Sequence, residues 1–171
     1  MFGKMMHKQL TIGSLIEHAG RFHGSTTVTS VETSGETTHV TWADIESNAR
    51  KLAAALDRLG IKQGARCGTI AWNNRRHLEI YFGVSGAGYV CHTINPRLTP
   101  EQLIYIINHA EDQVLFIDTT FVPAVAKLRP QITGTAHVVV LGERDDTIAQ
   151  QIDGVLFYTA LTPKPEIFRV L

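Results

Sequence analysis

The chain has 171 residues, and its 16 Lys and Arg side chains are balanced by 16 Asp and Glu, so its formal net charge is zero. A chain of this length buries roughly 70% of its unfolded surface, which is enough for one domain and a part of a second. Balanced charge without runs of like sign excludes the basic surface of a nucleic-acid binder, so no nucleic-acid partner is expected.

No targeting or membrane segment is predicted. The first ten residues, MFGKMMHKQL, lack the apolar core and cleavage site of a secretory signal. No stretch reaches the roughly 20 apolar residues that cross a bilayer. We therefore expect a cytoplasmic protein without a transmembrane segment.

Cysteine and histidine spacing predicts neither a disulfide nor a metal site. Cys67 and Cys91 each lie in an apolar run without a CxxC spacing, which favours two buried thiols in a reducing compartment. His7, His18 and His23 are close only in sequence, whereas a metal needs several ligands that converge on one point.

The first strands along the chain are predicted to form a β-hairpin. Residues 26–32 and 38–42 are rich in Val and Thr, and the polar, Gly-containing sequence TSGE connects them. The string TSGETT (33–38) resembles a nucleotide-binding loop, but it has one glycine, no nearby following Lys, and a strand after it. A phosphate loop leads into a helix, so the pattern favours a turn and excludes nucleotide binding there.

A helix is predicted after the hairpin. Thr41 and Asp44 have the spacing of a helix cap, and Gly60 is a suitable end. The apolar residues between them recur at spacings of four and three and therefore share one face. They are Ile45, Ala49, Leu52, Leu56 and Leu59.

Short apolar strands then alternate with helices. The predicted strands are 66–72, 89–94, 113–118 and 137–142, and the predicted helices are 75–88, 99–110 and 121–128. Such alternation is typical of a parallel sheet covered on both faces, with right-handed crossovers. The glycines of GVSGAG (83–88) end a helix instead of starting one, so they predict close helix packing and not a dinucleotide fingerprint.

The predicted fold is therefore α/β, a mostly parallel sheet flanked by helices with an N-terminal β-hairpin. Residues 1–142 form the predicted domain. Residues 143–171 lose the alternating pattern and are expected to be an irregular or truncated tail.

The stretch 71–118 resembles the amino-terminal region of the AMP-forming acyl-CoA synthetases, in particular the subgroup acting on fatty acids and methylmercaptopropionate. The likeness extends over about residues 10 to 142. It is carried by four motifs, which are Trp72-Asn73, Arg76-His77-Leu78-Glu79, His92-Thr93-Ile94-Asn95-Pro96-Arg97-Leu98 and Ile107-Asn108-His109-Ala110-Glu111-Asp112.

This resemblance implies a parent enzyme that joins a carboxylate to CoA. ATP and Mg²⁺ would give an acyl-adenylate and pyrophosphate, and CoA would then displace AMP. The family's Thr-Ser-Gly-Thr-Thr-Gly-x-Pro-Lys-Gly loop and catalytic lysine lie beyond the region that matches, and neither occurs in these residues. We expect the chain to be a partial amino-terminal domain, to lack catalytic residues, and to bind none of these cofactors tightly by itself.

The same resemblance gives candidate site residues. Thr93, Asn95, Pro96 and Arg97 follow a parallel strand, where open α/β sheets bind ligands, and related enzymes have their CoA channel near this loop. Arg97 suits a phosphate. The same residues also suit a simple turn before the helix cap at residue 99, and this interpretation is favoured modestly.

Two weaker candidates flank this group. His92 precedes the loop, in a strand expected to be covered on both sides, and a buried imidazole with one partner is its more ordinary role. Asn73 ends another strand, where a turn is the more ordinary role. His77 and Glu79 are two residues apart on a helix and so are not expected to form an acid–base pair.

Three interpretations of the sequence remain. The chain is either part of a ligase or a non-catalytic α/β module that binds a ligand or a second copy of itself through an exposed apolar patch. An enzyme that activates aryl or amino acids is the third interpretation, and the HTINPRL sequence argues against it.

Overall fold

The computed structural model describes residues 7 and 9–162. Its longer helices are α1 (Ile12–Phe22), α2 (Trp42–Arg58), α3 (Arg75–Ser85), α4 (Pro100–Ala110) and α5 (Val122–Leu128). Single helical turns are η1 (Thr119–Phe121), η2 (Arg129–Gln131), α6 (Asp146–Ala149) and α7 (Tyr158–Leu161). The strands are β1 (Thr27–Val31), β2 (Thr37–Thr41), β3 (Arg66–Ile70), β4 (Val90–Thr93), β5 (Val114–Ile117), β6 (His137–Val140) and β7 (Leu156–Phe157).

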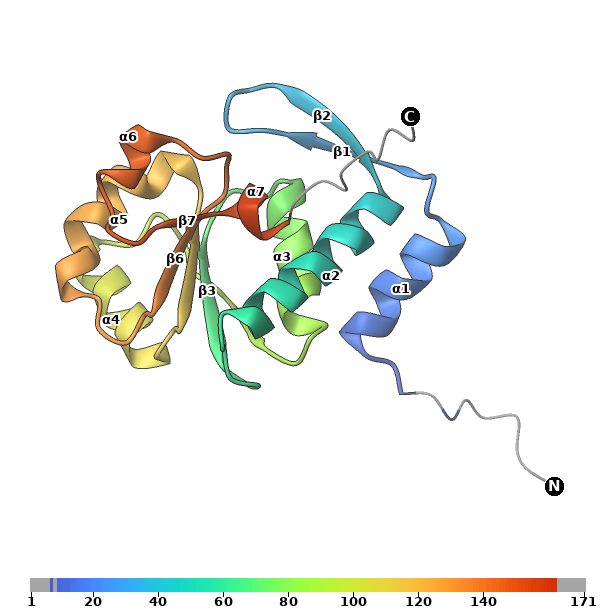
Figure 1. Ribbon diagram of the computed structural model, residues 1–171, viewed down its shortest axis with the longest axis horizontal. Helices are drawn as coiled ribbons and strands as arrows, with labels where there is room; N and C mark the ends of the chain where they lie inside the picture. Colours follow the sequence, from blue (N-terminus) through green and yellow to red (C-terminus); the bar gives the residue numbers. More distant parts are fainter. Residues whose placement is uncertain (1–6, 8, 163–171) are drawn as a thin grey trace, which may run out of the picture.

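Five parallel strands form the central sheet in the order β4-β3-β5-β6-β7. Helices α4 and α5 cover one face, and α2 and α3 cover the other, as Figure 1 shows. Helix α1 packs outside α2 and α3. All four residues of β5 are buried, since β5 lies in the middle of the sheet and both its faces are covered. The predicted α/β class with a covered parallel sheet is confirmed.

The predicted hairpin is also confirmed. Strands β1 and β2 pair antiparallel, and TSGETT forms the turn between them and the first residues of β2. Gly35 has φ 85°, a conformation that costs glycine little, and its N–H donates to the carbonyl of Glu32 at 2.9 Å.

The start of α2 is built as its sequence predicts. The Thr41 hydroxyl accepts from the amide of Asp44, and the Asp44 carboxylate accepts from the amide of Thr41 at 2.8 Å. Ile45, Ala49, Leu52 and Leu56 of the predicted face are buried.

Close helix packing at the GVSGAG glycines is confirmed. A methyl group on Gly83 would lie 2.8 Å from the carbonyl oxygen of Ala49 in α2. One on Gly86 would lie 3.4 Å from the Cα of Gly13 in α1. These glycines let α3 approach both neighbouring helices at backbone distance.

Two expectations need correction. Residues 146–161 are not an irregular tail, because α6, β7 and α7 lie there and β7 pairs with β6 through Val139↔Leu156 and Val140↔Phe157. A strand of two residues is too short to give a periodic pattern, so only its pairing defines it. The predicted tail beyond Thr162 lies outside the described residues.

The second correction concerns the strand that contains His92. It was expected to be covered on both sides, but none of the four residues of β4 is buried, and β4 is the edge strand of the sheet. An edge position cannot be read from composition, since a strand of β-branched residues suits either place.

The two cysteines are free thiols on neighbouring strands, in register with one another. Cys67 is buried, and Cys91 is half-buried. Burial raises the pKa of Cys67 to about 12 and that of Cys91 to about 11, so both remain protonated near neutral pH.

The contact between α3 and α2 predicts the effect of Gly83→Ala. The added methyl group meets backbone atoms of Ala49, which cannot move without shifting a helix. We expect a loss of about 1–3 kcal/mol in the free energy of unfolding, measured by urea denaturation. Gly142→Ala is the control, because its methyl would touch only the Thr119 side chain, at 3.3 Å. Equal losses in the two variants would contradict the prediction.

Candidate functional site

The strand order reverses between β3 and β5. After β3 the chain continues to β4 on one side of β3, and it then crosses back to β5 on the other side of β3. In open parallel sheets the crevice at such a switch point, outside the carboxyl ends of the strands, is the usual ligand site. Here residues 71–74 follow β3 and residues 118–121 follow β5. These two segments define the candidate site.

Asp118 holds the two segments together. Its carboxylate accepts a hydrogen bond from the Trp72 amide at 2.7 Å, and its own amide donates to the carbonyl of Ile70 at 3.0 Å. Burial raises the pKa of Asp118, while the Trp72 amide opposes that rise. The Trp72 ring lies against Phe121, with centroids 5.2 Å apart, and is 41% exposed. An aromatic surface is thus held at the switch point.

Glu32 connects the hairpin to the amino terminus of α3. Its carboxylate accepts from Arg75 Nε at 3.1 Å, from Thr38 Oγ1 at 2.9 Å, and from Arg76 Nη1. Ser30 Oγ also accepts from the amide of Arg75, at 2.9 Å. Burial acts to raise the pKa of Glu32, but Thr38 and the two guanidinium groups outweigh it and lower that pKa.

Glu79 continues this network into the core. It is fully buried, and its carboxylate accepts from Asn48 Nδ2 of α2 at 3.0 Å and from the Tyr158 hydroxyl of α7 at 2.8 Å. The guanidinium of Arg75 lies 3.6 Å away. Burial raises the pKa of Glu79, although these partners all favour the charged form. Burial also raises the pKa of Tyr158, so this hydroxyl remains a donor.

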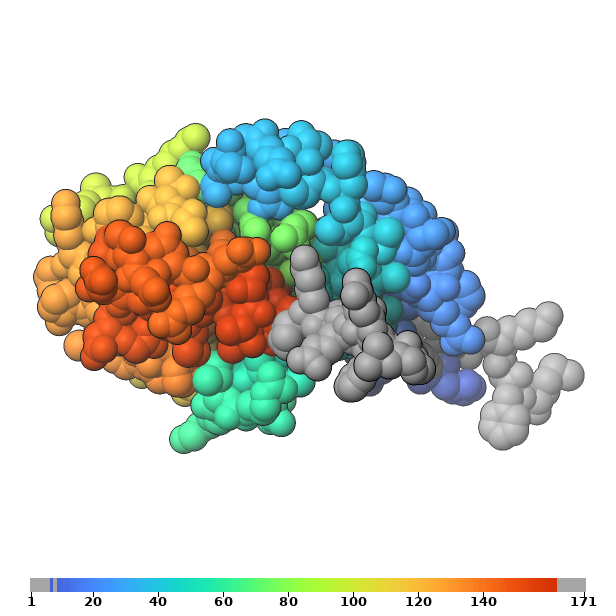
Figure 2. Space-filling model, turned by 45° about the horizontal axis from the view of Figure 1, so that its top comes forward, coloured from blue at the N-terminus to red at the C-terminus, as the bar shows by residue number. Residues whose placement is uncertain are grey.

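Three hollows surround the network. The first, of about 520 Å³, lies between β1 and α3 and includes Asn73 and His77. The second, of about 490 Å³, lies between the hairpin turn and the end of β6. The third, of about 460 Å³, is lined by residues of α2, α3 and α7. Figure 2 shows part of α3 in green between the hairpin above and α7 in red below.

The four residues proposed to line the CoA channel form a turn that is largely exposed. Asn95 Oδ1 accepts from the amide of Arg97 at 3.0 Å, and the Asn95 carbonyl accepts from the amide of Leu98 at 3.3 Å. Thr93 and Arg97 are exposed, and Pro96 is half-buried. None of the four lines the three hollows above, whereas Asn73 lines the first. The turn interpretation describes the geometry of this chain, and their role in CoA binding stays a prediction.

The hydrogen-bond partner of His92 among the described residues is Asp112. His92 Nδ1 lies 2.8 and 3.1 Å from the two carboxylate oxygens of Asp112, which is fully buried at the start of β5. The side chains meet across β3 at Gly68, where a methyl group would lie 2.8 Å from Asp112 Oδ2. This pair fastens the edge strand to the centre of the sheet.

His77 and Glu79 serve different contacts, as their spacing predicts. His77 Nε2 lies 3.0 Å from Thr69 Oγ1, while Glu79 contacts Asn48 and Tyr158. Within residues 7 and 9–162, no three His, Cys, Asp or Glu side chains come together in a way that could hold a metal ion.

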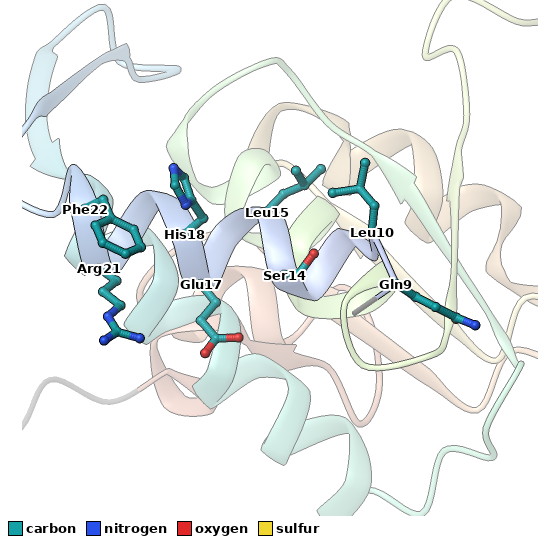
Figure 3. Close-up of a pocket in the computed structure, with 8 residues that line it drawn as sticks. All are labelled: Gln9, Leu10, Ser14, Leu15, Glu17, His18, Arg21 and Phe22. Atoms are coloured by element: carbon teal, nitrogen blue, oxygen red, sulfur yellow. The ribbon is translucent and has the colours of Figure 1, made fainter. Parts of the chain in front are cut away.

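A further hollow, of about 270 Å³, lies on the outer face of α1. Figure 3 shows Leu10, Leu15 and His18 on one side of the helix and Glu17 and Arg21 on the other. Leu10 and Leu15 are 75% and 47% exposed. This surface is remote from the switch point (Figure 1).

The sequence-based candidates did not include Asp118, Glu32 or Arg75. Asp118 could have been found, because it directly follows the apolar strand VLFI, at the carboxyl edge where ligands bind. Glu32 and Arg75 are 43 residues apart, so no local pattern connects them.

Comparison with known proteins places this geometry in a family. The family model for AMP-binding enzymes matches residues 15–165. The chain belongs to the AMP-binding enzyme family.

Relatives in the AMP-binding family match nearly the whole chain. A 3-methylmercaptopropionyl-CoA ligase of Ruegeria lacuscaerulensis is 56% identical over 161 residues, which are 94% of this chain and 30% of that protein. A medium-chain-fatty-acid–CoA ligase of Ectopseudomonas oleovorans is 51% identical, again over 94% of this chain and 30% of that protein. The chain thus spans about 30% of the length of these relatives.

Solved structures of other proteins share the fold. An acetoacetyl-CoA synthetase from Streptomyces lividans aligns with a TM-score of 0.78 at 21% identity, over 91% of this chain and 25% of that one. A coronafacic acid ligase from Pectobacterium brasiliense aligns with a TM-score of 0.76 at 13% identity, over 93% and 30%. At these identities the likeness concerns the fold alone.

The described part of this AMP-binding family member contains no helix with the length and apolar character needed to cross a membrane.

Glu79 makes a pH-dependent prediction. Its pKa is raised from 4.5 by burial, so between pH 4.5 and the raised pKa the folded chain binds more protons than the unfolded chain. Stability from this group is therefore complete below pH 4.5 and is lost as the pH rises through the raised value. Gln cannot titrate, so we expect the stability of Glu79→Gln relative to the wild type to increase across that window.

Urea denaturation at a series of pH values from 4.5 upward measures this difference. Glu36→Gln, on the exposed hairpin turn, is the matched control that provides the baseline. If the free energy of unfolding of Glu79→Gln minus that of the wild type stays constant or falls as the pH rises, the assignment is refuted.

Proposed function

We propose that this chain is the amino-terminal part of an AMP-forming ligase that converts a fatty or methylthio-substituted carboxylate to its CoA thioester. The observation that supports this proposal most strongly is the 56% identity to a 3-methylmercaptopropionyl-CoA ligase over 94% of the chain. The 51% identity to a medium-chain-fatty-acid–CoA ligase supports the same class of carboxylate. The parent would use ATP, Mg²⁺ and CoA and would act in the cytoplasm.

In this proposal the described residues build a scaffold and contribute no reacting group. The parallel sheet presents its strand ends at one edge, and Asp118, Glu32 and Glu79 fix the loops and the hairpin there. Thr93, Asn95, Pro96 and Arg97 would line the CoA channel of the parent, with Asn73 and His92 as weaker candidates. The exposed guanidinium of Arg97 follows β4 and is free to meet a CoA phosphate.

The chain by itself is expected to be inactive. Given ATP, Mg²⁺ and octanoate, the purified 171-residue chain should release no pyrophosphate above a no-enzyme blank in a coupled assay. The full-length medium-chain ligase of Ectopseudomonas oleovorans serves as the positive control. Pyrophosphate release by the chain would show that it carries its own adenylation site.

The CoA assignment is tested in the full-length parent. Loss of a hydrogen bond between a guanidinium and a phosphate costs about 1.5–3 kcal/mol, so Arg97→Ala should raise the KM for CoA by about 10- to 100-fold and leave the KM for ATP unchanged. Arg21→Ala, on the outer face of α1, is the control and should change neither constant. An unchanged KM for CoA in Arg97→Ala would remove Arg97 from the channel.

A second candidate function is association of two copies of the chain. The observation that favours it is the open edge of the sheet at β4, where Val90 is 48% exposed. Light scattering over a range of protein concentrations distinguishes a dimer from a monomer.

A further inference from the structure

The two cysteines of the sequence are direct neighbours in the central sheet. Cys67 lies in β3 and Cys91 in β4, and they are register partners in this parallel pair. Neighbouring strands are about 4.8 Å apart, so register partners have Cα atoms within the range of roughly 4.4–6.8 Å found in disulfides. Their spacing in the sequence gave no sign of this proximity, because it arises from the pairing of two strands.

Both cysteine side chains lie on the same face of the sheet. Cys67 belongs to the core cluster beneath α2 and α3, and Cys91 packs against that cluster. The next residue of β4, His92, is directed across Gly68 to Asp112, as expected when side chains alternate between faces. Burial raises the pKa of the Cys67 thiol, and the nearby Cys91 thiol raises it further. The two sulfur atoms therefore face a shared region of the core.

The two thiols differ in their access to solvent. Cys67 is fully buried, whereas Cys91 is half-buried in the edge strand. An oxidant therefore reaches Cys91 first, and Cys67 is the neighbouring thiol that can react next. Burial keeps both thiols protonated near neutral pH, with Asp112 also raising both pKa values. Because the thiolate is the reactive form, the reduced pair is stable under ordinary conditions and reacts under an oxidative challenge.

We propose that Cys67 and Cys91 form a reversible redox pair, which hydrogen peroxide converts into a disulfide between β3 and β4. The peroxide transfers one oxygen atom to the Cys91 sulfur, which gives a sulfenic acid and one water. The Cys67 sulfur then attacks the Cys91 sulfur. The S–S bond forms, the S–O bond breaks, and the hydroxyl group leaves with the Cys67 proton as a second water. Two electrons pass from the thiols to the peroxide, and a dithiol reductant returns them.

This disulfide would fasten the edge strand covalently. In the reduced chain, β4 is held by its backbone ladder with β3 and by the contact between His92 and Asp112. β4 leads directly into the turn at residues 94–98, so oxidation would fix the base of that turn. Disulfides of intracellular proteins are usually transient and redox-sensing, which fits a pair of this kind. The proposal is independent of the ligase proposal.

Peptide mapping tests the cross-link. Trypsin cleaves after Arg75 and Arg76, which separates Cys67 from Cys91. The purified 171-residue chain is treated with hydrogen peroxide in its folded state, and remaining thiols are blocked with iodoacetamide. Mass spectrometry of the unreduced digest should show peptides 67–75 and 77–97 joined, lighter by two hydrogen atoms than their sum. Dithiothreitol should release both peptides, and the oxidised chain should keep the circular dichroism spectrum of the reduced chain.

Two variants test the register and the order of reaction. Val90→Cys/Cys91→Ser moves the outer thiol to the opposite face of β4, at a position that is more exposed than that of Cys91. This variant should be oxidised at residue 90 without a link to Cys67. Cys67→Ala removes the second thiol, so the sulfenic acid of Cys91 should accumulate and be trapped by dimedone.

Each alternative outcome overturns the proposal. A wild-type chain that stays reduced has no redox pair, and one oxidised at Cys91 without a cross-link has no resolving thiol. A link between Cys91 of two copies assigns the reaction to the surface instead of the sheet. A cross-link of equal yield in Val90→Cys/Cys91→Ser removes the register as its basis. None of these results bears on the CoA and ATP chemistry proposed for the parent.

Discussion

The buried carboxylate of Glu79 joins parts of the chain that are far apart in sequence. It accepts hydrogen bonds from Asn48 of α2 and Tyr158 of α7, and Arg75 beside it continues to Glu32 of the hairpin. A buried charge is tolerated only when such partners surround it, and removal of one partner leaves the rest uncompensated. The hairpin, α2, α3 and α7 are therefore held in one mutual arrangement, and the carboxyl edge of the sheet is built on it.

That arrangement is more specific than apolar packing would be. The core clusters on the two faces of the sheet consist mainly of aliphatic side chains such as Leu, Ile and Val. Cores of this kind tolerate substitution when volume and pattern are kept. The contacts of Asp118 with the Trp72 amide and of Glu32 with Arg75 have defined directions and distances, so they fix the loops that leave β1, β3 and β5. Loops positioned by a rigid sheet are the usual location of binding residues.

The chain belongs to the AMP-binding enzyme family, and in it apolar packing builds the sheet while polar contacts fix the loops at the carboxyl ends of the strands. The chain spans about 30% of the length of its ligase relatives, and its described residues form a scaffold with a switch point, three hollows and no metal cluster. Within the central sheet, the edge strand β4 is the least enclosed strand, with none of its four residues buried.

The sequence by itself determined the family and the elements up to β6. Local chemistry specifies these features, since the cap at Thr41, the Ser-Gly turn of the hairpin, and the alternation of short apolar strands with helices each depend on neighbouring residues. Only the tertiary structure decided that β4 lies at an edge, that the two-residue β7 joins the sheet, and that Glu32 meets Arg75 and Glu79 meets Tyr158. These features depend on pairings between residues tens of positions apart, which leave no periodic trace in the chain.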